Sequence, residues 1–419
     1  MRKITCLLLL LCLLPSCALA EKTITLTFTG DITLGGEDYL RTAEDSFFAV
    51  YEREGAGYFL KNFADFFAED DLTVVNLEGV LTDNNALYPR DKGKGDDGYW
   101  FRGPAAYAKV LSAASVEVAS LANNHAFDYG AQGFRDTIAA VEAEGLGWFG
   151  TYNKNRDPET EKFYFYTKDG VTICLMSLLW DDYNPQDPNG NGAYLRQQIT
   201  EIKQSGQADA VIAILHGGQE YGRHRTKPQT IFTKMAISAG ADLVICHHAH
   251  VVMGMDVINN RSAFYSLGNF CFGGNRKAYQ ENKNRTPAVQ DAAPALMLRA
   301  VLTFDDDGTY KGQQITLYPV QTTGIDRAAG DTVQGNNYQP KFITGSLAAH
   351  VLHLMQIDMN YDASKTPKYS NAESINKTLR ALVMAREEEL AGGGPPRGRG
   401  GDDAPVPAGG SGIKPLNPR

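Results

Sequence analysis

The segment PQTIFTKMAISAGADLVICHHAH, residues 228–250, carries the pattern on which the fold prediction rests. Its first part has Pro near the start and Gly240 directly after the last apolar turn, an asymmetry typical of a helix. Its second part, Asp242–Cys246, is a short apolar run, typical of a strand that is buried on both faces. Three histidines follow at once, so the segment predicts a helix, a strand and a polar loop in succession.

Apolar runs of the same kind alternate with helical patterns from Thr23 onward. The expected strands are Thr23–Thr29, Leu72–Asn76, Val116–Ala122, Val171–Leu179, Ala210–Leu215, Asp242–Cys246 and Ala263–Leu267. Another helical pattern, Ala131–Glu144, ends before Gly145. This alternation predicts an α/β layered fold. In such folds, ligand sites form at the carboxyl ends of the strands.

The remainder of the chain predicts an extension and a tail. Leu296–Phe304 and Gln314–Val320 flank an Asp-rich turn and indicate a hairpin. Ser346–Met359 and Ala372–Leu390 have helical patterns, and the chain is rich in Gly and Pro after Leu390. We therefore expect a main domain over residues 22–325, a helical extension over 340–390 and a disordered tail over 391–419.

The first 20 residues have the features of a secretory signal. Arg2 and Lys3 precede the apolar run Ile4–Leu14, and Ala18-Leu19-Ala20 matches a cleavage site before Glu21. Alternatively, Leu14-Pro15-Ser16-Cys17 resembles a lipobox, which would limit the signal to residues 1–16 and tether the protein to a membrane through Cys17. Either alternative predicts an exported protein of the cell envelope, a lipoprotein or a secreted protein.

Composition excludes two classes of site. The net charge of -9 and the pI of about 5.5 argue against a nucleic-acid partner. After residues 1–20, the cysteines are Cys174, Cys246 and Cys271, which form no close pair. Neither a disulfide framework nor a cysteine-ligated zinc site is expected, and the apolar surroundings of Cys174 and Cys246 predict buried thiols.

Polar residues gather where the expected strands end. The segments are Gly30-Asp31, Asn76-Leu77-Glu78, Asn123-Asn124-His125, His216 to Tyr221, and His247-His248-Ala249-His250. Taken singly, Gly30-Asp31, Asn76-Leu77-Glu78 and His216 are more typical of a turn or of a structural histidine, whereas the pair His248 and His250 is as typical of metal ligands as of loop hydrogen bonds. Together they supply carboxylate, amide and imidazole groups, the ligand types of Mn, Fe or Zn.

These segments resemble the motifs of the CapA family of capsule-synthesis proteins, which is linked to poly-γ-glutamate production. The matching stretches are Phe28 to Gly35, Val75 to Gly79, Phe101 to Pro104, Ser120 to Gly130, His216 to Tyr221, Gly240 to Val251 and Tyr265 to Phe270. The resemblance covers about residues 22–275 in unbroken order. It implies a four-layer sandwich similar to the calcineurin-like metallophosphoesterases.

The resemblance also implies roles for individual residues. One or two divalent ions (Mn, Fe or Zn) would be held by Asp31, Glu78, Asn124, His216, His248 and His250. Glu78 falls at the position of a metal-bridging carboxylate, and His125 at that of the acid that protonates a leaving group. The chain departs from phosphoesterases of this fold at Thr33, where a histidine is usual, and at Asn76-Leu77-Glu78, where Gly-Asp-x-x-Asp is usual.

Other polar residues in these motifs have two interpretations each. Asp128 is either the N-cap of the helix that follows or a group that orients His125. Glu220 either supports His216 or is a surface acid, and Arg102 either contacts an anionic substrate or is solvated. Asn76, Asn123 and Asn269 are expected to support the ligands, Asn269 by a hydrogen bond to a ligand histidine.

Two functions of different classes follow from the resemblance. The first is a metal-dependent hydrolase outside the cytoplasm, acting on a phosphoester or a γ-glutamyl polymer in capsule synthesis. The second is a non-catalytic assembly, export or anchoring factor that binds an anionic cell-surface polymer through the metal site. His125 beside Asn124 favours the first, and the absence of a histidine at Thr33 favours the second.

Overall fold

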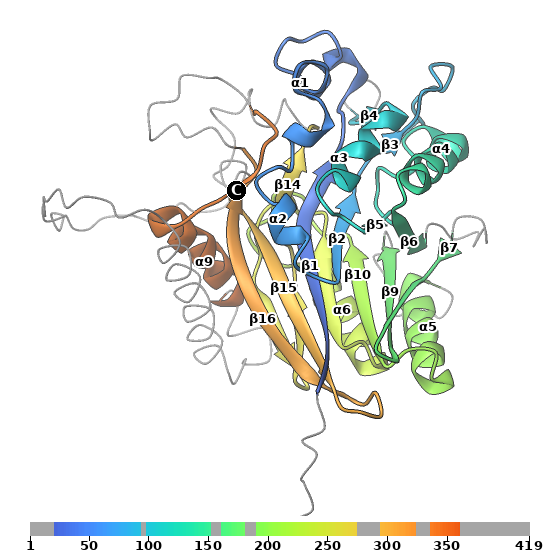
Figure 1. Cartoon of the computed structure of the whole chain (residues 1–419), viewed down its shortest axis with the longest axis vertical. Coiled ribbons are helices and arrows are strands. Elements are labelled where there is room, and N and C mark those ends of the chain that lie inside the picture. The colour runs from blue at the N-terminus through green and yellow to red at the C-terminus, as the bar shows by residue number, and fades with distance from the viewer. Residues whose placement is uncertain are drawn as a thin grey trace, which may run out of the picture.

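The structure is a computed structural model that describes residues 21–93, 98–151, 161–180, 190–274, 294–323 and 336–360. Figure 1 shows strands running side by side through the middle of the molecule, with helices on their outer faces. The helices are α1 (Phe47–Glu54), α2 (Ala64–Phe67), α3 (Lys109–Ser112), α4 (Gly130–Ala143), α5 (Asn191–Ser205), α6 (Lys227–Ala239) and α9 (Gly345–Asn360), with 3-10 turns at Asp38–Leu40, Ala56–Tyr58 and Ala105–Ala108.

Most strands belong to one large hydrogen-bonded sheet. They are β1 (Lys22–Thr33), β2 (Leu72–Leu77), β5 (Val118–Ser120), β6 (Gly147–Thr151), β7 (Glu161–Lys162), β8 (Tyr164–Lys168), β9 (Val171–Leu179), β10 (Ala210–His216), β11 (Leu243–His247), β12 (Met255–Ile258), β13 (Arg261–Phe264), β14 (Asn269–Phe272), β15 (Pro294–Phe304), β16 (Tyr310–Gln321) and β17 (Lys341–Phe342), with β3 (Val80–Leu81) and β4 (Arg102–Gly103) in a separate pair. The path runs β12-β13-β11-β10-β9-β6-β5-β2-β1-β15-β16-β17. From β1 to β11 along this path, neighbouring strands are parallel, so their carboxyl ends share one edge.

Three apolar clusters show that the sheet folds over into a four-layer sandwich. Leu26 of β1 and Ile212 of β10 belong to the same buried cluster, which therefore fills the space between the two halves of the sheet. A second cluster packs the outer face of the β1–β6 half against α1 to α4, and a third packs the β9–β11 half against α5 and α6. The order is helix, sheet, sheet, helix, and the predicted α/β sandwich is confirmed.

Local sequence explains the helix and strand with which the prediction began. Thr226 and Gln229 form a reciprocal capping box at the start of α6, and Gly240 ends the helix with φ 119°, a conformation that favours glycine. Along β10, Ile212 and Ala213 face different clusters, because successive side chains of a strand point to opposite faces. The strand is therefore apolar from Ala210 to Leu215, before it ends at His216.

The strand prediction was wrong in two details that affect the site. Strand β1 continues past Thr29 to Thr33, with an irregular register between Phe28 and Asp31, so Asp31 lies within it. Strand β11 runs Leu243–His247 and includes the first histidine. Expected strand Ala263–Leu267 corresponds to β13, Arg261–Phe264.

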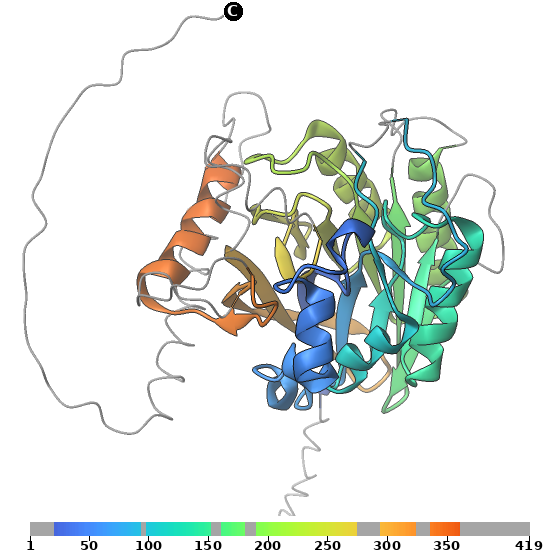
Figure 2. The same cartoon turned by 90° about the horizontal axis from the view of Figure 1, so that it is seen from above.

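Helix α9 packs against the apolar cluster that lies between the two halves of the sheet. Figure 2 shows it (orange) on the opposite side of the molecule from the helices drawn in green. Val351, Leu354, Met355 and Met359 are buried in the cluster between the sheet halves. The predicted hairpin is β15 and β16, and the predicted helix Ser346–Met359 is α9.

Several predictions lie outside the described residues. They are the signal over residues 1–20, the helix Ala372–Leu390 and the tail 391–419. The boundaries at 22–325 and 340–390 stay predictions. Among the residues that the structure describes, no helix is both long and apolar enough to cross a membrane.

Candidate metal centre

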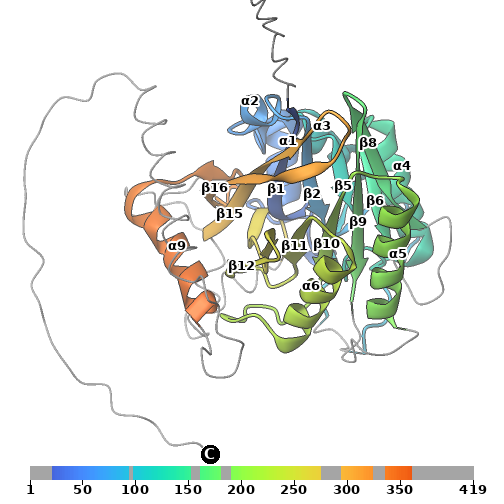
Figure 3. The same cartoon turned by 90° about the horizontal axis from the view of Figure 1, so that it is seen from below.

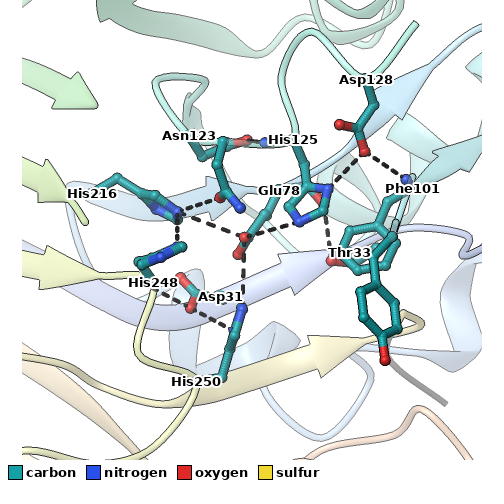
Figure 4. Close-up of polar contacts among 12 residues, drawn as sticks. Asp31, Thr33, Glu78, Phe101, Asn123, His125, Asp128, His216, His248 and His250 are labelled. Atoms are coloured by element: carbon teal, nitrogen blue, oxygen red, sulfur yellow. Dashed lines mark hydrogen bonds and ion pairs between the residues drawn. The ribbon is translucent and has the colours of Figure 1, made fainter. Parts of the chain in front are cut away.

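The predicted ligand residues converge at the carboxyl edge of the parallel strands (Figure 4). Asp31 belongs to β1, Glu78 follows β2, His216 ends β10, and His248 and His250 follow β11. These carboxylates and imidazoles form two groups in which all ligand atoms lie within 4.8 Å of one another. One group is Asp31, Glu78 and His250, the other is Glu78, His216 and His248. Glu78 belongs to both, as expected of a bridging carboxylate.

The Glu78 carboxylate has no hydrogen-bond donor among the described residues. It is fully buried, and neither oxygen has a hydrogen-bond partner. Burial raises the pKa of Glu78 well above 4.5, while the charge of His250 opposes this rise. A buried carboxylate without a donor is costly unless an ion is bound to it. The residues around Glu78 therefore fit a divalent cation.

Asp31 is held by two neighbours. Asn76 donates from Nδ2 to Oδ1 at 2.9 Å, and His247 Nδ1 lies 2.8 Å from the same oxygen. Burial raises the pKa of Asp31, but the charges and hydrogen bonds of His247 and His250 outweigh burial, so the pKa lies well below 3.8. Asp31 is therefore ionised and ready to bind a cation. His247 was not predicted as a site residue, although it stands in the same histidine motif.

His250 is oriented by Asn269. Its Nδ1 lies 2.9 Å from Asn269 Oδ1 and 3.3 Å from Asp31 Oδ2, while Nε2 lies 3.8 Å from Glu78 Oε1 without a hydrogen-bond partner. Burial lowers the pKa of His250, but Glu78 and Asp31 outweigh burial and raise it to about 10. The hydrogen bond expected from Asn269 to a ligand histidine is present, and it directs Nε2 toward Glu78.

Three further atoms that can bind a metal ion lie around His216 Nε2. Asn124 Oδ1 lies 2.8 Å from it, His248 Nδ1 3.1 Å, and Glu78 Oε1 3.6 Å. Burial lowers the pKa of His216 well below 6.5 and that of His248 to about 4. Both rings are therefore neutral at pH 7, the form that binds metal. His248 and His250 have φ values of 94° and 57°, and such backbone strain is often found at functional sites.

His125 lies beside these groups with a carboxylate behind it. Its Nδ1 is 2.6 Å from Asp128 Oδ2, and its Nε2 is 4.0 Å from Glu78 Oε1. Helix α4 begins at Gly130 with Tyr129 as its N-cap, so Asp128 is not the N-cap. The alternative interpretation, that Asp128 orients His125, agrees with the geometry. The Phe101 ring stacks on His125 with centroids 4.0 Å apart.

The remaining residues discussed in the sequence analysis support the Glu78 loop, lie near the site, or lie apart from the ligands. Thr33 donates to the Glu78 carbonyl at 2.8 Å, and Asn123 donates to the Leu77 carbonyl at 2.8 Å. Both shape the loop that carries Glu78. Glu220 is exposed, yet its charge opposes the lowering of the His248 pKa by burial, so Glu220 lies near the site. Arg102 is buried and pairs with Asp38 at 3.1 Å; no contact of its guanidinium with the ligand residues is present among the described residues.

Lys92 was not predicted as a site residue. It comes from the long polar connection Asp83–Pro104, and its Nζ lies 2.7 Å from Asp128 Oδ1 and 3.4 Å from His125 Nδ1. Burial lowers the pKa of Lys92, and the charge of Asp128 opposes this. A polar connection of this length is usually functional or mobile, and this is the sequence feature that could have pointed to Lys92.

Sequence comparison relates most of the described chain to one family. Residues 25–274 match the family described as bacterial capsule synthesis protein PGA_cap. The chain is 28% identical over 263 residues to a capsule biosynthesis protein CapA of Bacillus anthracis, covering 60% of each protein. It is also 28% identical over 268 residues to a PGA biosynthesis protein CapA of Bacillus subtilis (strain 168), covering 60% of this chain and 64% of that one. The match thus spans less than two thirds of these curated relatives.

Solved structures show weaker likenesses. A phosphatase from Mycoplasma pneumoniae is 12% identical with a TM-score of 0.42, covering 72% of this chain and 95% of that one. A 5'-nucleotidase precursor from Thermus thermophilus is 13% identical with a TM-score of 0.39, covering 71% of this chain and 54% of that one. TM-scores below 0.5 do not establish a common fold, so the fold assignment rests on the layers described above.

Proposed function

Since this chain belongs to the bacterial capsule synthesis protein family, we propose that it is a metal-dependent hydrolase that acts in capsule synthesis on a phosphoester or a γ-glutamyl polymer. One relative is named for PGA biosynthesis, which favours an anionic polymer as substrate. The observation that carries the proposal is the pair His125–Asp128, whose Nδ1–Oδ2 distance is 2.6 Å, beside the two ligand groups. A site that only binds a polymer has no need of a histidine oriented in this way.

The donor sets assign residues to one or two divalent ions. Asp31, Glu78 and His250 would hold one ion, and Glu78, His216 and His248, with the Asn124 amide oxygen, would hold the other. A divalent ion bound there would lower the pKa of water and stabilise the negative charge that develops in hydrolysis. The oxygen and nitrogen donors suit Mn, Fe or Zn.

The neighbouring side chains perform the proton transfer in this proposal. The Asp128 carboxylate accepts a hydrogen bond from Nδ1–H of His125 and so keeps Nε2 directed toward the substrate. His125 then donates its Nε2 proton to the leaving group, and the Phe101 ring excludes water from one face of the imidazole. Asn76 and His247 hold the Asp31 carboxylate in place, which fixes one side of the site.

A second candidate function is a non-catalytic capsule factor that binds an anionic polymer at the same site. Thr33 favours it, because its hydroxyl bonds the Glu78 carbonyl and the residue supplies no imidazole to the first ligand group. Under either function we place the protein at the cell envelope, exported by the signal in residues 1–20 and, if Cys17 is lipidated, tethered to the membrane.

Metal content and turnover distinguish the two candidates. The purified protein is analysed for bound metal and assayed with a generic phosphodiester and with a γ-glutamyl peptide. His248→Ala should lower bound metal, because one imidazole ligand is lost. His125→Ala should keep the metal and lower turnover by roughly 10²–10⁴-fold. Full activity in His125→Ala together with lost capsule function in His248→Ala would favour the binding factor.

A further inference from the structure

The carboxylate of Asp358 connects helix α9 to two loops of the metal centre. Asp358 is buried in the last turn of α9, beyond residue 274, where the family match ends. Its Oδ1 accepts the Arg225 backbone N–H at 2.5 Å, and its Oδ2 accepts the Gly254 N–H at 2.9 Å. Arg225 Nε lies 3.0 Å from the same Oδ2. A negative charge near the carboxyl end of a helix interacts unfavourably with the helix dipole. The hydrogen bonds of Asp358 to the two loops offset this cost.

One loop held by Asp358 carries the predicted ligand His250, and the other contacts that loop through Tyr221. Gly254 follows His250 by four positions, and Arg225 follows Tyr221 by four positions. Tyr221 donates its backbone N–H to the Ala249 carbonyl at 2.8 Å, and its ring lies 5.6 Å from that of His250. The two loops are therefore joined at the histidine motif and joined again at Asp358.

The contact at Gly254 is too close for any other residue. A Cβ atom there would lie 2.5 Å from Met359 Cγ, 2.9 Å from Asp358 Oδ2 and 3.0 Å from the Met355 carbonyl oxygen. Helix α9 thus packs directly on the backbone that leaves the histidine loop. Figure 3 shows α9 beside β12, the strand that begins at Met255.

Arg225 links Asp358 to two further buried side chains, Asp256 and Tyr265. Its Nη1 lies 2.9 Å from Asp256 Oδ2, which also accepts the Tyr265 hydroxyl at 2.8 Å. The guanidinium lies over the Tyr265 ring, 4.0 Å from the centroid. The Arg225 guanidinium lies between the two buried carboxylates of Asp358 and Asp256, so the geometry of the loops depends on all three side chains.

We propose that Asp358 is a positioning residue that holds the histidine loop from outside the family domain and thereby sets the metal affinity of His248 and His250. The proposal rests on the metal-dependent function proposed above. Asp358 touches no metal ligand; it acts through Gly254 and Arg225. Groups that orient metal ligands typically change affinity about 10–100-fold when they are removed.

The test compares Asp358→Ala with Val351→Ala in the full-length protein. Val351 is buried on the same helix, and its side chain bonds neither loop, so its loss lowers stability without releasing them. Mn²⁺ affinity is measured by calorimetry. Asp358→Ala should weaken Mn²⁺ binding about 10–100-fold, and Val351→Ala should leave it unchanged. Equal affinities in the two variants would overturn the proposal.

A metal-free readout separates this inference from the proposed function. In the absence of metal, hydrogen exchange at residues 219–226 and 248–254 should quicken in Asp358→Ala and not in Val351→Ala, and unchanged exchange would overturn the inference. If the unmodified protein binds none of Mn²⁺, Fe²⁺ and Zn²⁺, the hydrolase proposal fails and the exchange result alone decides the positioning role. Should Asp358→Ala fail to fold, Asp358→Asn, which keeps one acceptor oxygen, takes its place with a smaller expected change.

Discussion

His125 Nδ1 lies 2.6 Å from Asp128 Oδ2, and the same oxygen accepts the Phe101 backbone N–H at 2.8 Å. Lys92 approaches the other oxygen of Asp128 at 2.7 Å. The carboxylate is thus fixed by three groups, and the imidazole takes its orientation from the carboxylate. Burial lowers the pKa of His125, and the charge of Asp128 opposes this. Asp128 therefore determines both the direction and the proton affinity of the ring.

Asp128→Asn should lower kcat without loss of metal. In the proposed reaction His125 must be protonated, so activity should be lost as pH rises through the His125 pKa. Removing the Asp128 charge lowers that pKa further, and the basic limb of the pH–rate profile should move to lower pH. The profile is measured with metal-saturated enzyme. Glu144→Gln, at the carboxyl end of helix α4, serves as control, and a basic limb that coincides in all three proteins would contradict the role of Asp128.

Glu78→Gln should abolish binding at both ligand groups. Glu78 is the residue they share, and an amide replaces the carboxylate that faces His250 and His216. Removing the Glu78 charge also lowers the pKa of His250, so the metal-free variant should be less stable at pH 7 than the metal-free parent. Metal content and thermal unfolding are measured together. Glu117→Gln, at a half-buried carboxylate away from the site, should keep the metal; metal retained in Glu78→Gln would refute the shared site.

Metal binding should release protons and strengthen with pH. The pKa of His250 is about 10 in the metal-free protein, so the ring is charged at pH 7.5 and must lose its proton to bind metal. Mn²⁺ affinity should rise about tenfold per pH unit for each proton released, up to pH about 10. Calorimetry in buffers of different ionisation enthalpy counts the protons. His250→Ala should release fewer, and equal counts would exclude His250 as a ligand.

The same shift affects the metal-free fold. A pKa raised from 6.5 to about 10 stabilises the folded protein fully below pH 6.5, and this contribution disappears as pH rises through about 10. Unfolding of the metal-free protein at pH 7 and pH 10 therefore checks the sign independently of metal.

Periodicity predicted the elements whose pattern is local. Strand β9 was predicted with its bounds, because its apolar side chains are buried on both faces, Val171, Ile173 and Leu175 in one cluster and Cys174, Met176 and Leu178 in another. The continuation of β1 to Thr33 was not predicted. Gly30 and Asp31 are typical of a turn, and pairing of Asp31 with Asn76 of β2 and with Asn269 of β14 keeps them in the strand.

Site residues were predictable where they stand in a motif, and less so where a distant contact decides their role. Asp128 follows His125 by three positions and precedes a helix, so its sequence position suits either an N-cap or a histidine partner. Its bonds to His125 and Phe101 decide this, and they depend on tertiary structure. Asp358 could not be predicted, because nothing in a helical pattern shows that its carboxylate reaches Gly254.

The N-terminal prediction is tested by mass spectrometry of the protein from its native host. Cleavage after Ala20 should give a mature protein that begins at Glu21, whereas lipid modification should give one that begins at Cys17. Cys17→Ser should abolish the lipidated form and leave plain cleavage possible. Recovery of intact Met1 in the cytoplasm would exclude both routes.

Gly30→Ala should destabilise the fold and weaken metal binding together. A Cβ at Gly30 would lie 2.2 Å from the Gly268 carbonyl oxygen, which accepts the Asp31 N–H at 2.9 Å. The strain should cost about 1–3 kcal/mol or more, since backbone must move to admit the methyl group. Gly268 precedes Asn269, which orients His250, so the displacement should also reach a ligand.

Gly57→Ala is the matched control for this substitution. A Cβ at Gly57 meets no atom within 4 Å, so its effect should stay within about 0.5 kcal/mol. Urea unfolding gives the stability of each variant, and Mn²⁺ titration gives the affinity. If Gly30→Ala and Gly57→Ala unfold at the same urea concentration, the close approach of β1 to the Gly268 turn does not constrain the fold. A Gly30→Ala protein that is destabilised yet binds Mn²⁺ normally would show that the turn supports the strand and not the metal centre.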